Sequence, residues 1–308
     1  MLNASGNENR SAKRLLVCVY TDGVITAVSH LSTSCGQSNY WTCLRPARIC
    51  RMEHLGRLNV EPFRCASLLA GALAISSLMW TAASPDSFQT SNGAVIVTPI
   101  QHASFSLEAG GKRIYVDPSP EELFTNRPKA DLILITDVHG DHMDPAAISA
   151  LKKDGTHIIA PAAVAKTVTD AEVLSNGSRT TWDGWSIEAV PMYNMKRGPA
   201  PGKFYHDKGR GNGYVLTYGG KRFYIAGDTE GVPEMRNLRN IDVAFVPMNV
   251  PFTMTPEEAA DAVKAFHPKI VYPYHYRNQD GSKADLKRFM ADLSGTGIEV
   301  RLRDWYGR

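Results

Sequence analysis

The pattern of apolar and polar positions changes along the chain and separates a leader from a body. From residue 84 onward, short apolar runs are separated by glycine, proline and aspartate, which is typical of β-strands joined by turns. Residues 1–51 show no sustained period. We therefore take 84–308 as one folded domain, and we expect 1–51 to be a disordered leader or a spurious upstream extension.

The body begins as a series of strands. Gly110-Gly111 and Gly219-Gly220 each separate two strand-like runs, and such glycine pairs predict hairpins. The run "DLILIT", which ends at Thr136, is apolar nearly throughout, as expected of a strand buried on both faces.

Helix signals follow among the later strands. Asp144 precedes Pro145 and an apolar run that stops at Gly155, and Thr255 with Glu258 forms a capping box. Strands that alternate with helices predict an α/β (α+β) fold, with two sheets and helices packed outside them.

The segment 65–80, "CASLLAGALAISSLMW", is apolar but short for a bilayer span, which needs ~20 residues. Arginines precede it and small residues follow it, so 52–83 reads as a secretory signal cleaved after about Ala83. We expect an exported protein, periplasmic or secreted. The alternatives are a membrane anchor at 65–80 and, if this run is a buried helix, a cytoplasmic protein.

Charge and cysteine content narrow the chemistry of the body. Eight of the 34 Lys and Arg but only four of the 31 Asp and Glu precede residue 84, so the body is close to neutral and gives no reason to expect nucleic acid as a partner. All five cysteines lie in the first 65 residues. The body therefore has no thiol nucleophile. Separately, we expect a small-molecule substrate. The oligomeric state stays open.

Four potential metal ligands occupy six positions directly after the apolar strand, in "DVHGDH": Asp137, His139, Asp141 and His142. Neighbouring carboxylates repel each other unless a cation neutralises them, and a divalent ion held by imidazole and carboxylate can activate water. A charged surface turn is the alternative. Other candidates also follow strands, where side chains from distant segments can converge: Asp117, Asp228 and His275.

The ordered motifs "YVDP", "DVHGDH", "AGDTEG" and "PYHYR" resemble the metallo-β-lactamase superfamily. The body looks closest to the branch of ascorbate-phosphate lactonase-like and N-acylphosphatidylethanolamine phospholipase D-like enzymes, over roughly 94–305. This resemblance implies a four-layer αββα sandwich and a metal-dependent hydrolase.

The resemblance also implies roles for individual residues. Asp117 would support the ligand loop, and His139 would bind the first metal. Asp141 and His142 would bind the second metal together with His275. Asp228 would bridge both metals.

Two positions depart from the family pattern. Asp137 replaces the first histidine of the motif, and the place of the third-motif histidine falls at Asn194. Asp137, with Asn194 as a further candidate ligand, would favour Mn²⁺ or Fe²⁺ more than imidazole does and weaken the preference for Zn²⁺. The alternative is a decayed first site, so one or two divalent ions remain open.

Further residues are candidates for the pocket. His102 is expected either to face the metals as a catalytic residue or to bond to backbone at a strand end. His206 is expected to be an exposed loop histidine or a residue that swings in to the substrate or metal. Arg277, two residues beyond His275, is a candidate anion contact, and Tyr193 is a candidate general acid.

These observations predict a hydrolase that uses a metal-bound hydroxide oriented by Asp141. The expected substrate is a phosphodiester or a phosphorylated small molecule, and the alternative is a lactone or carboxylic ester. A hypothesis of another class is a non-catalytic metal-binding scaffold with a degenerate site.

Overall fold

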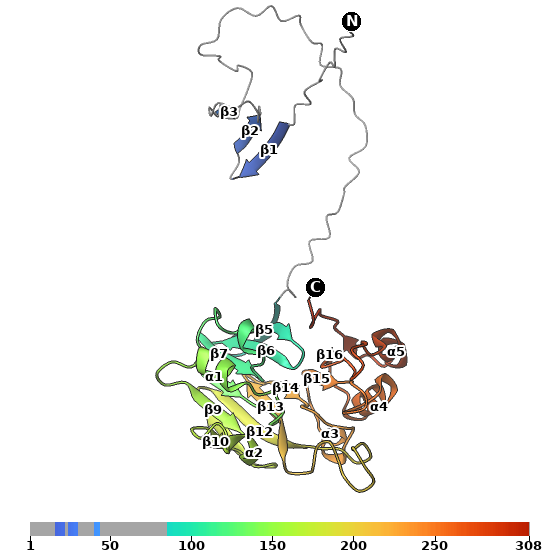
Figure 1. The fold of residues 1–308 in the computed structure, drawn as a ribbon. Helices are drawn as coiled ribbons and strands as arrows, with labels where there is room; N and C mark the ends of the chain where they lie inside the picture. The colour runs from blue at the N-terminus through green and yellow to red at the C-terminus, as the bar shows by residue number, and fades with distance from the viewer. Residues whose placement is uncertain (1–15, 22–23, 30–39, 44–84, 308) are drawn as a thin grey trace, which may run out of the picture. The chain divides into compact units, whose positions relative to one another are not determined.

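A computed structural model describes residues 16–21, 24–29, 40–43 and 85–307 (Figure 1). The chain separates into two compact units, Met1–Ile75 and Ser76–Arg308. Within the first unit, three antiparallel strands form one sheet: β1 (Leu16–Thr21), β2 (Val24–Ser29) and β3 (Tyr40–Cys43). The predicted signal at 52–83 lies outside the described residues. Among those that are described, no helix has the length and apolar character needed to cross a membrane.

The second unit contains two sheets of seven strands, and each sheet is built from one continuous half of the domain. The first sheet has the order β10-β9-β8-β7-β6-β5-β4, and the second runs from β11 to β17 in chain order. The strands of the first sheet are β4 (Asp86–Thr90), β5 (Gly93–Gln101), β6 (Ser104–Ala109), β7 (Lys112–Val116), β8 (Leu132–Leu134), β9 (His157–Ala160) and β10 (Glu172–Val173). Those of the second are β11 (Arg179–Trp182), β12 (Trp185–Met192), β13 (Gly211–Tyr218), β14 (Lys221–Ile225), β15 (Val243–Pro247), β16 (Ile270–Tyr274) and β17 (Glu299–Val300).

Both sheets begin antiparallel and continue parallel. Strands β4 to β7 and β11 to β14 pair as hairpins, and the later strands of each sheet run parallel. Both predicted glycine hairpins are confirmed, between β6 and β7 and between β13 and β14. All four glycines have positive φ, which side chains with a Cβ rarely adopt.

The core alternates across each strand. In β8, Leu132 and Leu134 face the large cluster between the sheets, whereas Ile133 packs in a second cluster with Ile148 of the first helix. The prediction that this strand is buried on both faces is confirmed. The same alternation along the other strands produces one apolar layer between the sheets and another under the helices.

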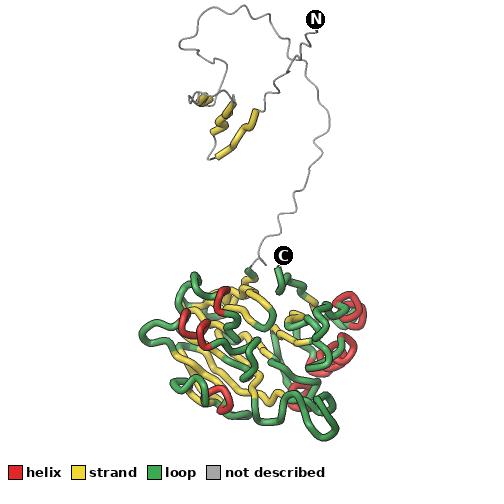
Figure 2. The backbone as a smooth tube through the Cα atoms, viewed as in Figure 1, coloured by secondary structure: helices red, strands yellow, loops and turns green. Residues whose placement is uncertain are grey.

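Helices cover the outer faces and complete the predicted αββα sandwich. The first sheet is covered by the 3₁₀ helix η1 (Glu121–Leu123), α1 (Pro145–Leu151) and α2 (Ala162–Ala165). The second half carries α3 (Pro233–Arg236), α4 (Pro256–Phe266) and α5 (Leu286–Asp292), which lie together at one side of the strands (Figure 2). The α/β fold class predicted from the pattern is therefore confirmed.

The predicted caps are present, although two boundaries differ. The Asp144 side chain accepts from the amide of Ala146 at the start of α1, and Thr255 with Glu258 forms both bonds of the capping box of α4. Helix α1 ends at Leu151, before the predicted stop at Gly155. The alternating run "GIEVRLRDW" at residues 297–305 predicts a longer strand, but β17 covers only Glu299–Val300.

Candidate metal centre and its cavity

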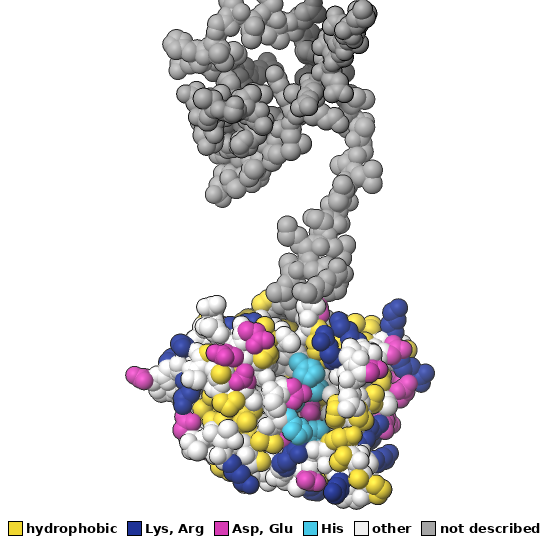
Figure 3. All heavy atoms as spheres, viewed as in Figure 1, with side chains coloured by type: hydrophobic (Ala, Val, Ile, Leu, Met, Phe, Trp, Pro, Cys, Tyr) yellow, Lys and Arg dark blue, Asp and Glu magenta, His cyan; other side chains and the backbone are white. Residues whose placement is uncertain are grey.

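The predicted ligands lie at one rim of the sandwich because they follow the ends of strands from both sheets. Asp117 follows β7, Asp228 follows β14 and His275 follows β16. Asp117 and His275 have φ of 46° and 47°, in the left-handed region. Such a conformation is costly for a residue other than glycine and is common at functional sites. Figure 3 shows histidine and acidic side chains gathered on this face of the domain.

His142 is held by the carboxylate of Asp117. Its Nδ1 lies 2.9 Å from Oδ2 of Asp117, and both residues are fully buried. Asp117 also accepts from the backbone amide and hydroxyl of Thr136, at 2.7 and 2.6 Å. Because the carboxylate binds the Nδ1 proton, Nε2 of His142 presents its lone pair to the centre of the rim.

Asp228, His142 and His275 converge on one point. Nε2 of His142 lies 3.2 Å from Oδ2 of Asp228 and 3.2 Å from Nε2 of His275, which in turn lies 3.4 Å from Oδ1 of Asp228. Oδ1 of Asp228 and Nδ1 of His275 are buried and have no hydrogen-bond partner within residues 85–307. Two ring nitrogens facing each other beside a carboxylate fit a divalent cation between them.

The charges of this group are strongly coupled. Burial alone would raise the pKa of Asp228, but His275 and His142 hold it well below its ordinary value. Burial alone would lower the pKa of His142, but Asp228, Asp141 and Asp117 hold it well above. The site therefore stabilises a positive charge next to Asp228, whether that charge is a proton or a metal ion.

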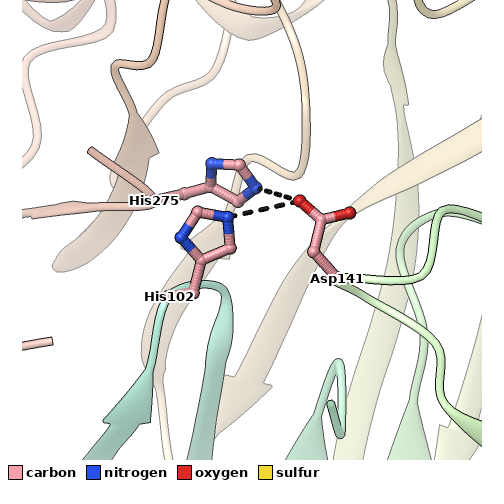
Figure 4. Close-up of side chains that lie close together, drawn as sticks. All are labelled: His102, Asp141 and His275. Carbon is pink, nitrogen blue, oxygen red and sulfur yellow. Dashed lines mark hydrogen bonds and ion pairs between the residues drawn. The ribbon is translucent and has the colours of Figure 1, made fainter. Parts of the chain in front are cut away.

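Asp141 joins His102 to His275 at the edge of the cavity (Figure 4). Its Oδ2 lies 3.2 Å from Nε2 of each histidine. Burial and then His275 lower the pKa of His102 to about 4, so its ring is neutral at ordinary pH. Of the two alternatives for His102, the structure places its ring in the site. Its backbone amide donates to the carbonyl of Trp305, and its carbonyl accepts from the amide of His275.

A second cluster contains Asp137, His139 and His206. Oδ2 of Asp137 lies 3.1 Å from Nδ1 of His139 and 3.7 Å from Nε2 of His206. Nε2 of His206 also lies 3.3 Å from Oδ2 of Asp228, which therefore borders both clusters. His206 is only 1% exposed, so the expectation of an exposed loop histidine does not describe it.

Asn194 lies behind His206 instead of among the ligand atoms. Its Oδ1 accepts from Nδ1 and from the backbone amide of His206, at 2.7 and 2.8 Å, and its Nδ2 donates to the carbonyl of Phe252. His206 thus presents Nε2 to the cluster, in the role that the family resemblance gave to Asn194. Asn194 acts on His206 as Asp117 acts on His142.

Arg210 binds Asp137 through two nitrogens, with Nη2 2.8 Å from Oδ2 and Nε 3.2 Å from Oδ1. Asp137 is fully buried, so this bidentate pair neutralises its charge inside the protein. No local sequence pattern indicates this contact, because it joins residues 73 positions apart. The neighbouring Lys208 instead binds Glu234, at 2.7 Å.

A cavity of about 470 Å³ opens onto both clusters. It is lined by His102, His139, Asp141, Tyr205, His206, Asp228, Asn249, Phe252, Arg277 and Asn278. Arg277 is thus placed in the cavity, whereas Tyr193 does not line it and donates to Glu234 at 3.0 Å. Tyr205, Asn249, Phe252 and Asn278 carried no sequence signal, because nothing in their spacing indicates that their loops meet.

Known proteins resemble this chain in fold and in sequence. The family model described as "Beta-lactamase superfamily domain" matches residues 97–275, more than half of the chain. A UPF0173 metal-dependent hydrolase of Thermococcus onnurineus is 35% identical over 218 residues, which are 65% of this chain and 92% of that protein.

Two solved structures extend this similarity. A protein from Parabacteroides distasonis, named as a metal-dependent hydrolase, is 45% identical, with a TM-score of 0.67 over 72% of this chain and 99% of that one. A metallo hydrolase from Ignicoccus hospitalis is 26% identical, with a TM-score of 0.57 over 68% and 94%.

The two-sheet sandwich with a histidine and aspartate cluster at its rim defines the metallo-β-lactamase fold. The chain belongs to this superfamily and is a metal-dependent hydrolase. The two clusters are suited to a divalent ion.

Proposed function

We propose that this hydrolase cleaves a phosphodiester or another phosphorylated small molecule. The position of Arg277 supports this proposal, because it lines the same cavity as Asp141 and Asp228. Its guanidinium lies 4.4 Å from the centre of the Tyr306 ring, and no carboxylate within residues 85–307 pairs with it. An arginine held against an aromatic face and free of a carboxylate suits a phosphate oxygen.

The glycine-rich segment "KGRGNG", Lys208 to Gly213, offers two further cations for a phosphate, but both are already engaged. Arg210 neutralises Asp137, and Lys208 is paired with Glu234. The segment "KGRGNG" is therefore a poorer candidate for a phosphate contact than Arg277. Anion recognition is assigned to the side of the cavity where Arg277 and Asn278 lie.

The residues of this chain supply binding and orientation. His142, Asp228 and His275 would hold one ion, with Asp137, His139 and His206 as a second candidate set. A bound divalent ion supplies activated water at neutral pH and offsets the negative charge that develops during hydrolysis. The Asp141 side chain is 46% exposed to the cavity, so it can accept a hydrogen bond from water and direct it towards the substrate.

A lactone or carboxylic ester is the second candidate. Tyr205 and Phe252 pack edge to face, with ring centres 5.0 Å apart, and give the cavity an aromatic wall. Such a wall suits the apolar part of an acyl substrate. A non-catalytic scaffold is disfavoured, because the cavity opens directly onto both clusters.

Replacing Arg277 tests the substrate class. The full chain would be loaded with Mn²⁺, Fe²⁺ or Zn²⁺ and assayed with bis(p-nitrophenyl) phosphate, p-nitrophenyl phosphate, p-nitrophenyl acetate and a γ-lactone. We expect hydrolysis of a phosphate ester, and Arg277→Gln to lower kcat/KM for it by about 10- to 100-fold, as for the loss of a hydrogen bond to a charged group.

Arg179→Gln is the matched control, since Arg179 is an exposed arginine paired with Glu188 on β11 and β12. It should behave like the wild-type protein. Hydrolysis of the acetate or lactone alone, or an equal effect of Arg277→Gln on all substrates, would refute the phosphate proposal.

A further inference from the structure

We infer that Glu230 is a positioning residue of the second cluster. Its carboxylate holds the arm, which is the segment 193–210 between β12 and β13 and carries Asn194 and His206, against the turn that carries Asp228. Glu230 lies two positions beyond Asp228, in "AGDTEG", and is only 3% exposed. It belongs to neither cluster of potential ligands. The inference concerns how the chain holds an ion and does not depend on the class of substrate.

The carboxylate of Glu230 is bound by three consecutive backbone amides of the arm. Oε2 accepts from the amides of Met195 and Lys196, at 3.1 Å each, and Oε1 accepts from the amide of Arg197 at 2.8 Å. The guanidinium of Arg197 adds a positive charge, with Nη1 3.5 Å from Oε1. Consecutive amides that point at one spot form a concavity that binds an anion. Glu230 supplies that anion from within the chain.

Glu230 also helps to orient Asn194. Nδ2 of Asn194 lies 3.3 Å from Oε1 of Glu230 and 2.8 Å from the carbonyl oxygen of Phe252. Oδ1 of Asn194 accepts from the backbone amide of His206 at 2.8 Å, and the amide of Asn194 donates to the carbonyl of His206 at 2.9 Å. A backbone carbonyl only accepts and a backbone amide only donates, so these contacts fix which side of the Asn194 amide group faces His206. The place of His206 therefore depends on contacts that Glu230 completes.

The backbone of Glu230 ties the arm to the turn of Asp228 as well. The amide of Glu230 donates to the carbonyl of Tyr193 at 3.0 Å, and the amide of Tyr193 donates to Oγ1 of Thr229 at 3.2 Å. Asp228 borders both clusters, and its Oδ2 lies 3.3 Å from Nε2 of His206. Glu230 thus joins the shared aspartate to the histidine that the arm supplies.

Loss of the Glu230 carboxylate should affect the two clusters unequally. Three amides of the arm would lose their acceptor, and buried amides without one are rare in folded proteins. The arm would then shift, and His206 with it. The turn of Asp228 keeps other supports, such as the bond from the amide of Gly227 to the hydroxyl of Tyr274 at 3.0 Å. The first cluster should therefore keep its geometry.

A cavity beside Glu230 makes this role open to chemical rescue. The cavity has a volume of about 280 Å³, and Glu230 lines it together with Met195, Lys196 and Arg197. In Glu230→Ala, the three amides would face this space without an acceptor. A formate ion offers the same two oxygens as the missing carboxylate and should restore the position of the arm. A general loss of stability would not respond to formate in this way.

The test is calorimetric titration of the metal-free full chain with Mn²⁺ or Zn²⁺, and His206→Ala identifies the binding step of the second cluster. In Glu230→Ala and Glu230→Gln, we expect that step to weaken about 10- to 100-fold, as is typical when support for a metal ligand is lost. The other step should stay as in the wild-type protein. Sodium formate should restore the affinity of Glu230→Ala but not that of Glu230→Gln, whose side chain still fills the space.

Hydrogen exchange of the metal-free protein gives a second measurement. The amides of residues 195–197 should exchange faster in Glu230→Ala, and formate should slow them again. Glu234→Ala is the matched control, because Glu234 binds Lys208 at 2.7 Å and accepts from the hydroxyl of Tyr193 at 3.0 Å. This variant removes a nearby carboxylate that does not bind the three amides. It should keep both binding steps and show no response to formate.

Equal weakening of both binding steps, or no change in either, would overturn the inference. So would a failure of formate to restore Glu230→Ala, or a wild-type protein in which His206→Ala alters no binding step. If metal binding responds as expected while no phosphate ester is hydrolysed, the inference stands and only the proposed function fails.

Discussion

At the scale of single residues, two imidazoles are oriented from behind in the same way by different groups. Asp117 accepts from Nδ1 of His142, and Asn194 accepts from Nδ1 of His206. In both cases Nε2 is left for the centre of the rim. The Asp117 carboxylate also helps Asp228 and Asp141 to hold the pKa of His142 well above its ordinary value.

Asn194 therefore offers a test of the second cluster. Asn194→Ala removes the acceptor for His206, so we expect one ion to bind about 10- to 100-fold more weakly, as is typical when such a supporting residue is lost. The ion at His142, Asp228 and His275 should be unaffected. Calorimetric titration of the metal-free protein with Zn²⁺ or Mn²⁺ measures both, and the surface variant Asn237→Ala is the control. Equal weakening of all binding would contradict this role for Asn194.

The charge of Asp137 is balanced by Arg210, a residue far away in the sequence. Bound by Arg210, it forms a neutral pair, so the cluster keeps an oxygen next to His139 and His206 without an added net charge. Oδ2 still faces both histidines while it accepts from Arg210.

The sequence predicted the part of the site that lies close to its motifs. Asp137, His139, Asp141 and His142 share one loop, and Asp228 and His275 follow recognisable strands. His206, Arg210 and Tyr306 depend on the path of a loop and a tail. That path is set by contacts such as the bond between Asn194 and the backbone of His206, which no local pattern encodes.

At the scale of elements, the turn after β14 positions Asp228. Gly227 has a φ of 65°, and a Cβ there would lie 2.4 Å from Sδ of Met192 and 3.3 Å from Cβ of Thr136. The backbone therefore needs glycine for two reasons, its conformation and the close approach of β12. The turn is rigid because it is packed against a neighbouring strand.

A comparison of Gly227→Ala with Gly220→Ala separates the effect of the backbone conformation from the effect of the close contact. Gly220 also has a positive φ, of 81°, but a Cβ there would meet nothing within 4 Å. We expect Gly220→Ala to lower the free energy of unfolding by about 1–2 kcal/mol through backbone strain alone. Gly227→Ala should cost about 1–3 kcal/mol more through the clash and should weaken metal binding. Urea unfolding measures both, and equal losses would show that the contact with Met192 is unimportant.

Local sequence signals predicted well those elements whose ends are set by residues close by in the sequence. Hairpin glycines and helix caps act within a few residues, and those of β6–β7, β13–β14, α1 and α4 are confirmed. The run at residues 297–305 forms only the two-residue strand β17, and the side chains of Arg301 and Arg303 bind Asp86 of the other sheet. Sequence periodicity does not reveal such tertiary ion pairs.

At the scale of the whole molecule, both sheets contribute to the metal centre. His142 comes from the first half of the domain, and Asp228 and His275 come from the second. A bound ion therefore links the two sheets in the folded protein and has no comparable site in the unfolded chain. Binding of this kind stabilises the native state by mass action.

Removal of the metal should lower the melting temperature. With free ion at 100 times its dissociation constant, we expect the loaded protein to be more stable by about 2.7 kcal/mol, and a chelator should abolish the difference. Scanning calorimetry of the full chain with and without chelator measures it. In His142→Ala most of this difference should disappear. A metal-free protein that melts at the same temperature as the loaded one would contradict this expectation.

Because the domain is divided into two continuous halves, one cut between the sheets would give two fragments. Within residues 85–307, the chain passes from the first sheet to the second only once, between Val173 of β10 and Arg179 of β11. Both clusters of potential ligands draw residues from both sides of that passage. Two fragments separated there would each carry a whole sheet but no whole cluster. Metal retention would then report their reassembly, as a split reporter does.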